Sequence, residues 1–364
     1  MKKIAIQTLQ LTNNYGGILQ AFALQYYLEE LGYKVTHLNR VNRPSAIILK
    51  LKIILFKLSN QSFFRAEKRV NTIFSSFLNE YINLSETLYT MSEWKNYIKD
   101  NKIDLVIVGS DQVWRLEYIK DLYPEFFLDF KFLDTKKASY AASFGVTDFE
   151  NNNVKEIKNL LSDFSGLSVR EDSAKLFLKE LLEKGVYQHI DPTLLLTSKQ
   201  YIEKFKLEDK IKKDDLFCYI LDKSKIKQNI IQNINEKLNL DLLFVYGSAV
   251  NLDNYRDPEI LSKPNIESWL QGFLSSKFII TDSFHGMVFS IIFNKPFIVI
   301  ANLERGVSRF TSLLSILGLE ERLININEEW DEEIINKEID FNKINSLVEK
   351  EQKRSKEYLV NLLV

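Results

Sequence analysis

The most constraining feature of this sequence is a regular alternation of short apolar runs with longer segments of helical periodicity. In the second half, four apolar runs of strand length are each followed or preceded by such a segment: LFCYILD (216–222), DLLFVYG (241–247), KFIITDS (277–283) and PFIVIAN (296–302). Continuous apolar runs are typical of strands that are buried on both faces of a parallel sheet. We therefore expect a parallel α/β sheet covered by helices.

The first half shows the same alternation. An apolar strand at 3–9, a polar glycine loop, a helix at 18–33 and a strand at 34–39 form a β-α-β unit. Further strands are predicted in DLVIVGSD (104–111), KKASYAASFG (136–145), GLSVRED (166–172) and QHIDPTLLL (188–196). Their polar ends are candidate ligand contacts, because open α/β sheets bind ligands at the carboxyl ends of their strands.

The length of 364 residues exceeds the usual size of a single hydrophobic core. Between residues 197 and 215 the sequence is charged and helical without a large apolar block, and we place a domain boundary there. We expect two α/β domains, 1–200 and 201–364. The charged helical segment at the end of the chain either caps the second domain or crosses back to the first.

Charge and composition exclude several other classes of protein. The 48 Lys and Arg residues against 49 Asp and Glu residues give a net charge of −1, which lacks the positive field of a typical nucleic-acid binder. Cys218, in an apolar run, is expected to be buried.

The chain start lacks the features of a secretory signal, so we expect a cytoplasmic protein. The basic segment 45–58 is too short and too charged to span a membrane; it could lie on the inner membrane surface, near a lipid-linked acceptor, although a packed helix is favoured.

The segment TDSFHG (281–286) carries the strongest functional signal. A predicted strand ends there and a helix begins at His285, so that the imidazole lies at the mouth of the sheet. The helix N-terminus offers backbone N–H groups to a phosphate or carboxylate, and Gly286 permits close approach. The alternative is that Thr281, Asp282 and Ser283 only cap the helix and that His285 is a surface residue.

The chain contains two other histidines, His37 and His189, and neither has an evident partner motif. Three scattered histidines without carboxylates at suitable spacing argue against a zinc site, and we predict no metal centre. The sequence also lacks the GxGxxG and GxxxxGK[ST] patterns, so it does not support a Rossmann-type dinucleotide site or a P-loop.

Other candidate ligand contacts lie at strand ends. The loop that contains Asn14, Tyr15, Gly16 and Gly17 suits backbone contacts to a sugar or phosphate, or is simply a tight turn. Asp111 could bind sugar hydroxyls or cap the following turn. Three arginines could hold an anion: Arg170, which is favoured but could instead pair with a neighbouring acid, and Arg305 and Arg309.

Seven segments taken together, in both content and order, resemble the polysaccharide pyruvyl transferase family: NNYGGILQAFALQ, VGSDQVW, SYAASFG, SVRED, DPTLLL, TDSFHG with the following SIIFNKPFI, and SRFTSLLSILGL. The resemblance spans residues 13 to 319. It implies two Rossmann-like domains that face each other across a cleft, similar to GT-B glycosyltransferases. It also implies that phosphoenolpyruvate is the donor, as a co-substrate with no further cofactor, and that the product is a pyruvate ketal of a sugar.

Roles for the candidate residues follow from this resemblance. His285 would protonate the methylene of phosphoenolpyruvate or relay the proton of the attacking hydroxyl. Arg170 and the helix N-terminus at Ser283 and Gly286 would hold the donor, and Asp111 with the loop 14–17 would contact the acceptor. Family members often have an arginine two residues before the histidine, where this chain has Ser283, so Arg305 or Arg309 could supply that charge.

Two other functions stay open at this point. The chain could be a GT-B glycosyltransferase that uses a nucleotide-sugar, with the helix at His285 cradling the diphosphate. It could also be a non-catalytic protein that binds anionic glycans or assists capsule assembly. The sequence does not name the acceptor sugar, because acceptor pockets are built from loops.

Overall fold

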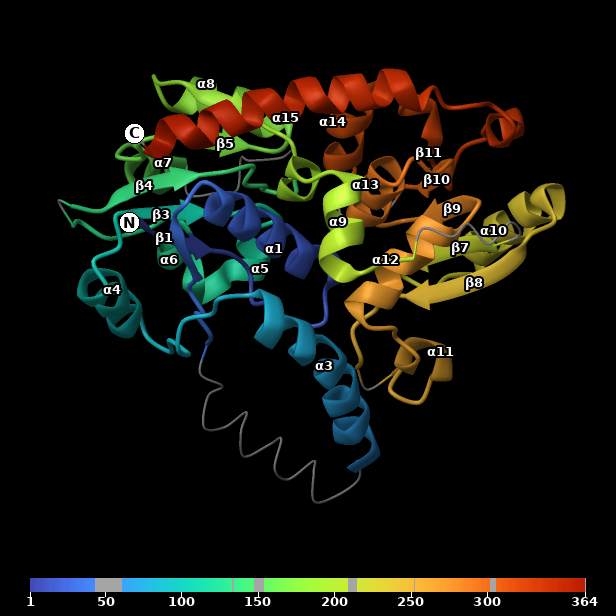
Figure 1. Cartoon of the computed structure of the whole chain (residues 1–364), viewed down its shortest axis with the longest axis horizontal. Helices are drawn as coiled ribbons and strands as arrows, with labels where there is room; N and C mark the ends of the chain where they lie inside the picture. Colours follow the sequence, from blue (N-terminus) through green and yellow to red (C-terminus); the bar gives the residue numbers. More distant parts are fainter. Residues whose placement is uncertain are drawn as a thin grey trace.

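The computed structural model describes residues 1–42, 61–132, 134–146, 154–208, 215–251, 253–301 and 306–363. It contains two larger parallel sheets and a two-stranded parallel pair, each confined to one side of residue 200 (Figure 1). This architecture confirms the predicted fold class. The division into domains at residue 200 stays a prediction.

The first sheet has the strand order β2-β1-β3-β4, and all its neighbours are parallel. Isolated bridges extend it from β4 to a parallel pair, β5 and β6. The strands are β1 (Lys3–Gln7), β2 (Lys34–His37), β3 (Leu105–Val108), β4 (Lys136–Ser139), β5 (Leu167–Val169) and β6 (Val186–Gln188). The helices of this half are α1 (Tyr15–Glu30), α3 (Gln61–Tyr81), α4 (Met91–Asp100), α5 (Leu116–Ile119), α6 (Tyr123–Phe126), α7 (Val154–Leu161), α8 (Asp172–Leu181) and α9 (Ser198–Phe205).

The second sheet has the order β11-β10-β9-β7-β8 and is also parallel throughout. Its strands are β7 (Asp215–Ile220), β8 (Asp241–Tyr246), β9 (Phe278–Thr281), β10 (Phe297–Ile300) and β11 (Leu323–Ile324). Its helices are α10 (Lys225–Leu238), α11 (Pro258–Leu261), α12 (Ile266–Ser275), α13 (Phe284–Ile292) and α14 (Ser308–Leu317), and the chain ends in α15 (Phe341–Leu363). The strands β9 and β10 are buried along their whole length, as their apolar sequences require.

Two local predictions are wrong. The segment QHIDPTLLL was expected to be a strand, but β6 ends at Gln188 and residues Pro192–Leu195 form a 3-10 turn. Pro192 has no N–H for a sheet ladder, and Asp191 caps the turn through the Thr193 N–H. The predicted glycine loop before the first helix is shorter than expected, since α1 begins at Tyr15 and includes both glycines in its first turn.

A shared hydrophobic core joins the two halves. Tyr15 and Phe22 of α1 belong to the same buried cluster as Phe217, Trp269 and Phe289 of the second half. The rings of Tyr15 and Trp269 are stacked, with centroids 4.9 Å apart. Such aromatic pairs contribute about 0.5–1.5 kcal/mol beyond their buried area. The core therefore fixes α1, and the residues just before it, against the second sheet.

The last helix, α15, crosses back to the first half, which is one of the two arrangements that the sequence left open (Figure 1). The Tyr358 hydroxyl donates to the Ser139 carbonyl at 2.8 Å, and the Gln352 side chain donates to the Leu194 carbonyl at 2.6 Å. Leu359 and Leu362 pack in the same core cluster as β1 and β3 residues. The helix thus ties the end of the chain to the first sheet.

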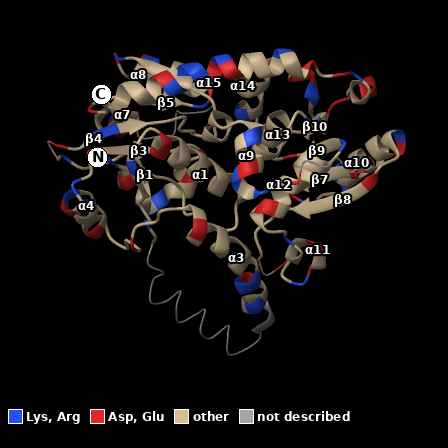
Figure 2. Ribbon diagram, in the orientation of Figure 1, with Lys and Arg blue, Asp and Glu red and all other residues tan. Residues whose placement is uncertain are grey.

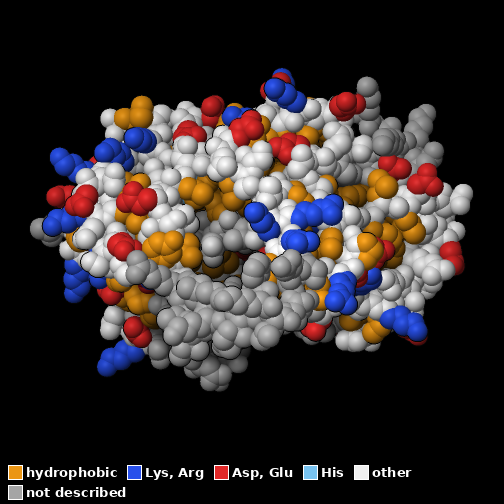
Figure 3. All heavy atoms as spheres, turned by 90° about the horizontal axis from the view of Figure 1, so that it is seen from below, with side chains coloured by type: hydrophobic (Ala, Val, Ile, Leu, Met, Phe, Trp, Pro, Cys, Tyr) orange, Lys and Arg blue, Asp and Glu red, His pale blue; other side chains and the backbone are white. Residues whose placement is uncertain are grey.

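Charges of both signs are distributed over the helices of both halves (Figure 2). Lys and Arg side chains nevertheless gather near the middle of the face seen from below (Figure 3). None of the described helices is both long enough and apolar enough to cross a membrane. The segment 45–58 lies outside the described residues, so its contact with a membrane surface stays a prediction.

Candidate active site

The carboxyl ends of strands from both sheets converge on one polar cavity of about 220 Å³. This is the edge at which parallel α/β sheets bind ligands. The first half contributes the lining residues Leu9, Asn13, Asn14, Asp111, Gln112 and Tyr118, and the second half contributes Tyr219, Leu221, Gly247, Ala249, Ser283, Phe284, His285 and Arg309. The cavity therefore needs both halves.

His285 lies in the first turn of α13 and lines this cavity. The helix begins at Phe284 because the side chain of Ser283 accepts a hydrogen bond from the Gly286 N–H at 3.3 Å. The imidazole packs directly on α1: a Cβ added at Gly16 would lie only 2.0 Å from His285 Nδ1. A glycine is required at position 16 because the ring occupies the space of a side chain there.

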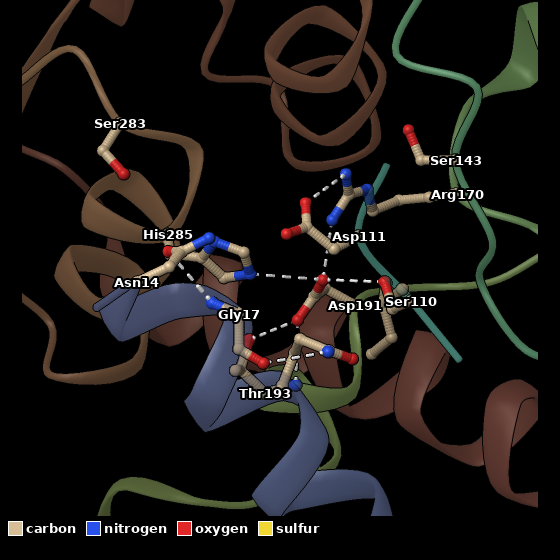
Figure 4. A network of polar contacts seen from close by, with 12 residues as sticks. Asn14, Gly17, Ser110, Asp111, Ser143, Arg170, Asp191, Thr193, Ser283 and His285 are labelled. Carbon is tan, nitrogen blue, oxygen red and sulfur yellow. Dashed lines mark hydrogen bonds and ion pairs between the residues drawn. The ribbon is translucent and has the colours of Figure 1, made fainter. Parts of the chain in front are cut away.

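Asp191 faces the other side of this ring, with its Oδ2 3.6 Å from His285 Nε2 (Figure 4). The same oxygen accepts from Arg170 at 2.8 Å and from the Ser110 hydroxyl at 3.0 Å, while Oδ1 accepts from the Thr193 N–H and hydroxyl. Burial alone would raise the pKa of Asp191. The His285 ring, the Arg170 charge and the Thr193 hydrogen bond lower it by more than burial raises it. The pKa of this carboxyl is therefore well below its ordinary value, and the group is an anion at neutral pH.

Arg170 follows the end of β5, as predicted, and also makes the pairing with Glu171 that the sequence left open. Its guanidinium is buried and pairs with three carboxylates: Asp191 at 2.8 Å, Glu171 at 3.3 Å and Asp111 at 3.7 Å. It also lies over the Phe284 ring, 4.4 Å from the centroid. It is not among the residues that line the cavity. Arg170 thus contacts Asp111 and Asp191 behind the cavity wall, and its role in holding a donor stays a prediction.

Arg309, from the first turn of α14, is the predicted arginine that does line the cavity. Burial, followed by the charge of Arg170, lowers the pKa of Arg309 to about 10, so it is still a cation at neutral pH. Its guanidinium carbon is 5.8 Å from the centroid of the Phe284 ring. Arg305 lies outside the described residues, and its predicted role stays a prediction.

Asp111 lines the cavity at the end of β3 and has a positive φ of 72°, an unusual backbone conformation for a residue other than glycine. Its main chain bridges to Ala142, which fixes the turn. Conformational strain of this kind often occurs at functional sites. The carboxylate is thus held at the cavity wall by the backbone on one side and by Arg170 on the other.

The four residues of the predicted acceptor loop divide into two groups. Asn14 lines the cavity, and its side chain caps α1 by accepting from the Gly17 N–H at 3.2 Å. Tyr15 is placed elsewhere than predicted: it is fully buried, and its hydroxyl donates to the Pro264 carbonyl at 2.6 Å. Tyr15 and both glycines therefore have structural positions, because their space or hydrogen-bonding groups are already used by the protein.

At the N-terminus of α13, where an anion site was predicted, Gly286 already contacts other residues of the protein. The Gly286 N–H is used by Ser283, and a Cβ at Gly286 would lie 2.2 Å from Thr281 Oγ1, so this glycine serves packing rather than ligand approach. Ser283 does line the cavity. The N–H groups of Phe284 and His285 have no intrahelical partner at this end of the helix.

The other two histidines do not line this cavity. Burial lowers the pKa of His37 to about 4, and burial with nearby cations does the same for His189. The Nδ1 atom of His189 lies 2.8 Å from the Ser168 hydroxyl. Among the described residues, no group of three or more His, Cys, Asp or Glu side chains could hold a metal ion.

Asp191, which faces His285, was not predicted as a site residue. A signal for it exists, since an Asp-Pro pair that follows a short strand marks a capped turn at a strand end. Several other cavity-lining residues were not predicted: Gln112, although it lies in the segment VGSDQVW, and Tyr118, Tyr219, Gly247 and Ala249.

Two facing Rossmann-like halves, with a cavity between the carboxyl ends of their strands, define a protein of the GT-B architecture. The sequence profile described as polysaccharide pyruvyl transferase matches residues 14–304, and the chain belongs to this family. No curated protein sequence matches at a significant level.

Solved structures agree with this architecture. The UDP-GlcNAc 2-epimerase of Methanocaldococcus jannaschii, in complex with UDP-GlcNAc and UDP, is similar with a TM-score of 0.51 at 15% identity, over 100% of this chain and 99% of that one. Arabidopsis thaliana UGT89C1 with UDP-L-rhamnose has a TM-score of 0.50 at 9% identity, over 99% of both chains. An alpha-glucosyltransferase in complex with UDP has a TM-score of 0.51 at 11% identity, over 99% of this chain and 95% of that one. These identities support the shared fold alone.

Proposed function

We propose that this protein transfers the pyruvyl group of phosphoenolpyruvate to hydroxyls of a sugar in polysaccharide biosynthesis, with release of phosphate. The observation that carries the proposal is the arrangement of His285. Its ring lies in a cavity that Arg309 also lines, and an ionised carboxylate faces its Nε2 at 3.6 Å. Membership of the polysaccharide pyruvyl transferase family supports the reaction class.

His285 would move the proton in this reaction. The methylene carbon of phosphoenolpyruvate gains a proton and becomes a methyl group, while a sugar oxygen forms a bond to the adjacent carbon and loses its own proton. A second hydroxyl then attacks the same carbon, and the C–O bond to phosphate breaks. The proton of this hydroxyl is transferred to the leaving phosphate or to His285. A histidine held by a carboxylate can both donate and accept these protons, because Asp191 stabilises the imidazolium and fixes the ring orientation.

Arg309 would hold the donor. Its planar guanidinium matches a carboxylate through two parallel hydrogen bonds, and such a charge-assisted pair is strong at a buried arginine like this one. It would thus take the place of the arginine that Ser283 replaces. The N–H groups at the start of α13 would add partial positive charge beside His285.

The acceptor would contact the wall formed by the first half. Asn14, Asp111 and Gln112 line that side and offer amide and carboxylate groups that suit sugar hydroxyls. Asp111 is held by Arg170, so its orientation is fixed before a sugar binds.

The proposal is tested by incubating the protein with phosphoenolpyruvate and a panel of nucleotide-linked and lipid-linked sugars. Phosphate release and a mass gain of the acceptor that matches a pyruvate ketal are the expected results. His285→Gln, which keeps the side chain polar and of similar size, should abolish turnover while its melting temperature stays near that of the wild type. Lys199→Ala is the matched control, because this lysine side chain is 82% exposed.

Two results would overturn the proposal. Tight binding of a UDP- or GDP-sugar, with no response to phosphoenolpyruvate, would identify a glycosyltransferase instead. Retained acceptor binding without turnover for any donor would identify a glycan-binding protein.

A further inference from the structure

Tyr118 is an exposed aromatic residue of the cavity that the reaction outlined above does not use. It belongs to the short helix α5, lines the cavity and is 49% exposed. The other two aromatic residues that line the cavity in the described part of the chain, Tyr219 and Phe284, are each only 2% exposed. Tyr219 packs edge-on against Trp269, and Phe284 has the Arg170 guanidinium over its ring. Among these three rings, Tyr118 is therefore the one that a ligand can reach.

The exposure of the lining residues separates the floor of the cavity from its mouth. Asp111 and His285 are buried, whereas Asn14, Tyr118 and Ala249 are exposed. A sugar that presents hydroxyls to His285, while the rest of a larger acceptor stays in solvent, has to extend through this mouth. Tyr118 is thus in a position to contact the acceptor away from the reacting atoms.

Arg115 supports the Tyr118 ring from one side. Its guanidinium carbon lies 4.7 Å from the ring centroid. The guanidinium is itself held by hydrogen bonds: Nε and NH2 donate to Glu117 Oε2 at 2.9 and 2.7 Å, and NH1 donates to Gln112 Oε1 at 3.3 Å. Because Arg115 covers one face and the residue is still half-exposed, the opposite face is open to a ligand. A ring that is already held in place loses less conformational entropy when a ligand binds.

A pyranose ring has two kinds of surface that this part of the cavity matches. Its ring C–H bonds form a flat apolar face, and its hydroxyls project from the edge. The face of an aromatic ring carries negative potential, which attracts the weakly positive C–H groups. Carboxylate and amide groups bind the hydroxyls. Tyr118 offers the first surface, Asp111 and Gln112 offer the second, and all three lie within one short segment, 111–118.

We propose that Tyr118 is the platform on which the pyranose ring of the acceptor stacks, with the hydroxyl edge of that ring turned toward Asp111. The role of this sugar as a pyruvyl acceptor rests on the proposed function. Tyr118 thereby determines specificity: it selects ring-closed sugars that have a flat C–H face, and it disfavours open-chain polyols, which offer hydroxyls without such a face.

The binding test needs no turnover. Saturation-transfer NMR measures binding of methyl β-D-glucopyranoside and methyl β-D-galactopyranoside, with D-glucitol as the open-chain polyol and uridine as a probe for base stacking. Tyr118→Leu keeps an apolar side chain without a flat ring and should weaken binding of at least one pyranoside by about tenfold, as expected when one face of a ring is no longer buried. Tyr118→Phe keeps the ring and should bind like the wild type. Tyr187→Leu is the matched control, because Tyr187 is 52% exposed and does not line the cavity.

A kinetic test separates this role from a structural one. With an acceptor that is turned over, Tyr118→Leu should raise the acceptor KM, while kcat and the KM for phosphoenolpyruvate stay near the wild-type values, because the platform contacts the sugar away from the reacting atoms. A general disturbance of the cavity would instead raise both KM values together. The melting temperature should not change, since the side chain is half-exposed.

The outcomes distinguish this inference from the proposed function. Unchanged pyranoside affinity in Tyr118→Leu would overturn the platform even if pyruvyl transfer occurs, and so would a wild type that binds none of the pyranosides. An equal loss in Tyr118→Phe would assign the contact to the hydroxyl and contradict stacking. Binding of uridine, but not of pyranosides, that depends on Tyr118 would identify a base-stacking residue instead. Pyranoside binding that depends on Tyr118, without any reaction of phosphoenolpyruvate, would support the platform and contradict the pyruvyl reaction.

Discussion

The close contact between Gly16 and His285 gives the sharpest prediction. In Gly16→Ala the new methyl group would lie 2.0 Å from Nδ1 and 2.2 Å from Cγ of the imidazole. Ordinary contacts between such atoms are about 3.5 Å, so the ring must retreat by roughly 1.5 Å. A displacement of about 1 Å in a catalytic group costs on the order of 100-fold in rate. We expect a loss of at least that size in kcat, with a smaller change in the KM for the donor.

The cost in stability should be modest by comparison. Overpacking by one methyl group costs about 1–3 kcal/mol, which urea denaturation can measure. Gly185→Ala is the matched control, because its new methyl group would meet its nearest neighbour, the Tyr187 hydroxyl, at an ordinary 3.4 Å. Wild-type turnover in Gly16→Ala, or a crystal structure in which the His285 ring has not moved, would refute the reasoning.

Four further predictions follow from the other contacts of the site. Asp191→Asn should lower the free energy of unfolding by about 3–5 kcal/mol, since it breaks a buried pair with Arg170, and should abolish turnover; a stable variant would contradict this. Because the folded state holds the Asp191 pKa below its unfolded value of about 3.9, this stabilisation is complete above about pH 5 and declines as the pH falls below 4. The difference between wild type and Asp191→Asn in urea denaturation should therefore shrink between pH 5 and pH 3. Tyr15→Phe should cost about 1 kcal/mol of stability without changing the acceptor KM, and a raised KM would restore its predicted role as an acceptor contact. Arg309→Lys should raise the KM for phosphoenolpyruvate by about tenfold or more, because the paired hydrogen bonds are lost, and an unchanged KM would place the donor carboxylate elsewhere.

The sequence predicts the fold well, for a simple reason. The central strands β9 and β10 are apolar runs buried along their whole length, and burial on both faces leaves little choice of residue there, whereas the edge strand β8 is apolar but largely exposed. The start of α13 is also determined by neighbouring residues, since Ser283 caps a helix that begins one residue later. The family resemblance, which the profile match over residues 14–304 confirms, adds the GT-B architecture.

The candidate site is less predictable, because most of its contacts join distant parts of the chain. Arg170 has the same local sequence whether it faces a ligand or three carboxylates, and only the folded chain brings Asp111 and Asp191 to it. Tyr15 looks like a loop residue in the sequence, yet it packs against Trp269 of the other half. No local pattern reports which face of α1 meets the second sheet.

By itself, the sequence determined the parallel α/β elements, their approximate ends and the position of His285 at the mouth of a sheet. These features depend on hydrophobic periodicity and capping, which act over a few residues. The tertiary structure decided that Asp191 faces His285, that Gly16 leaves room for the imidazole, and that Arg309 rather than Arg170 lines the cavity. These contacts depend on how the two halves pack together, because each one joins residues that are neighbours only in the folded chain.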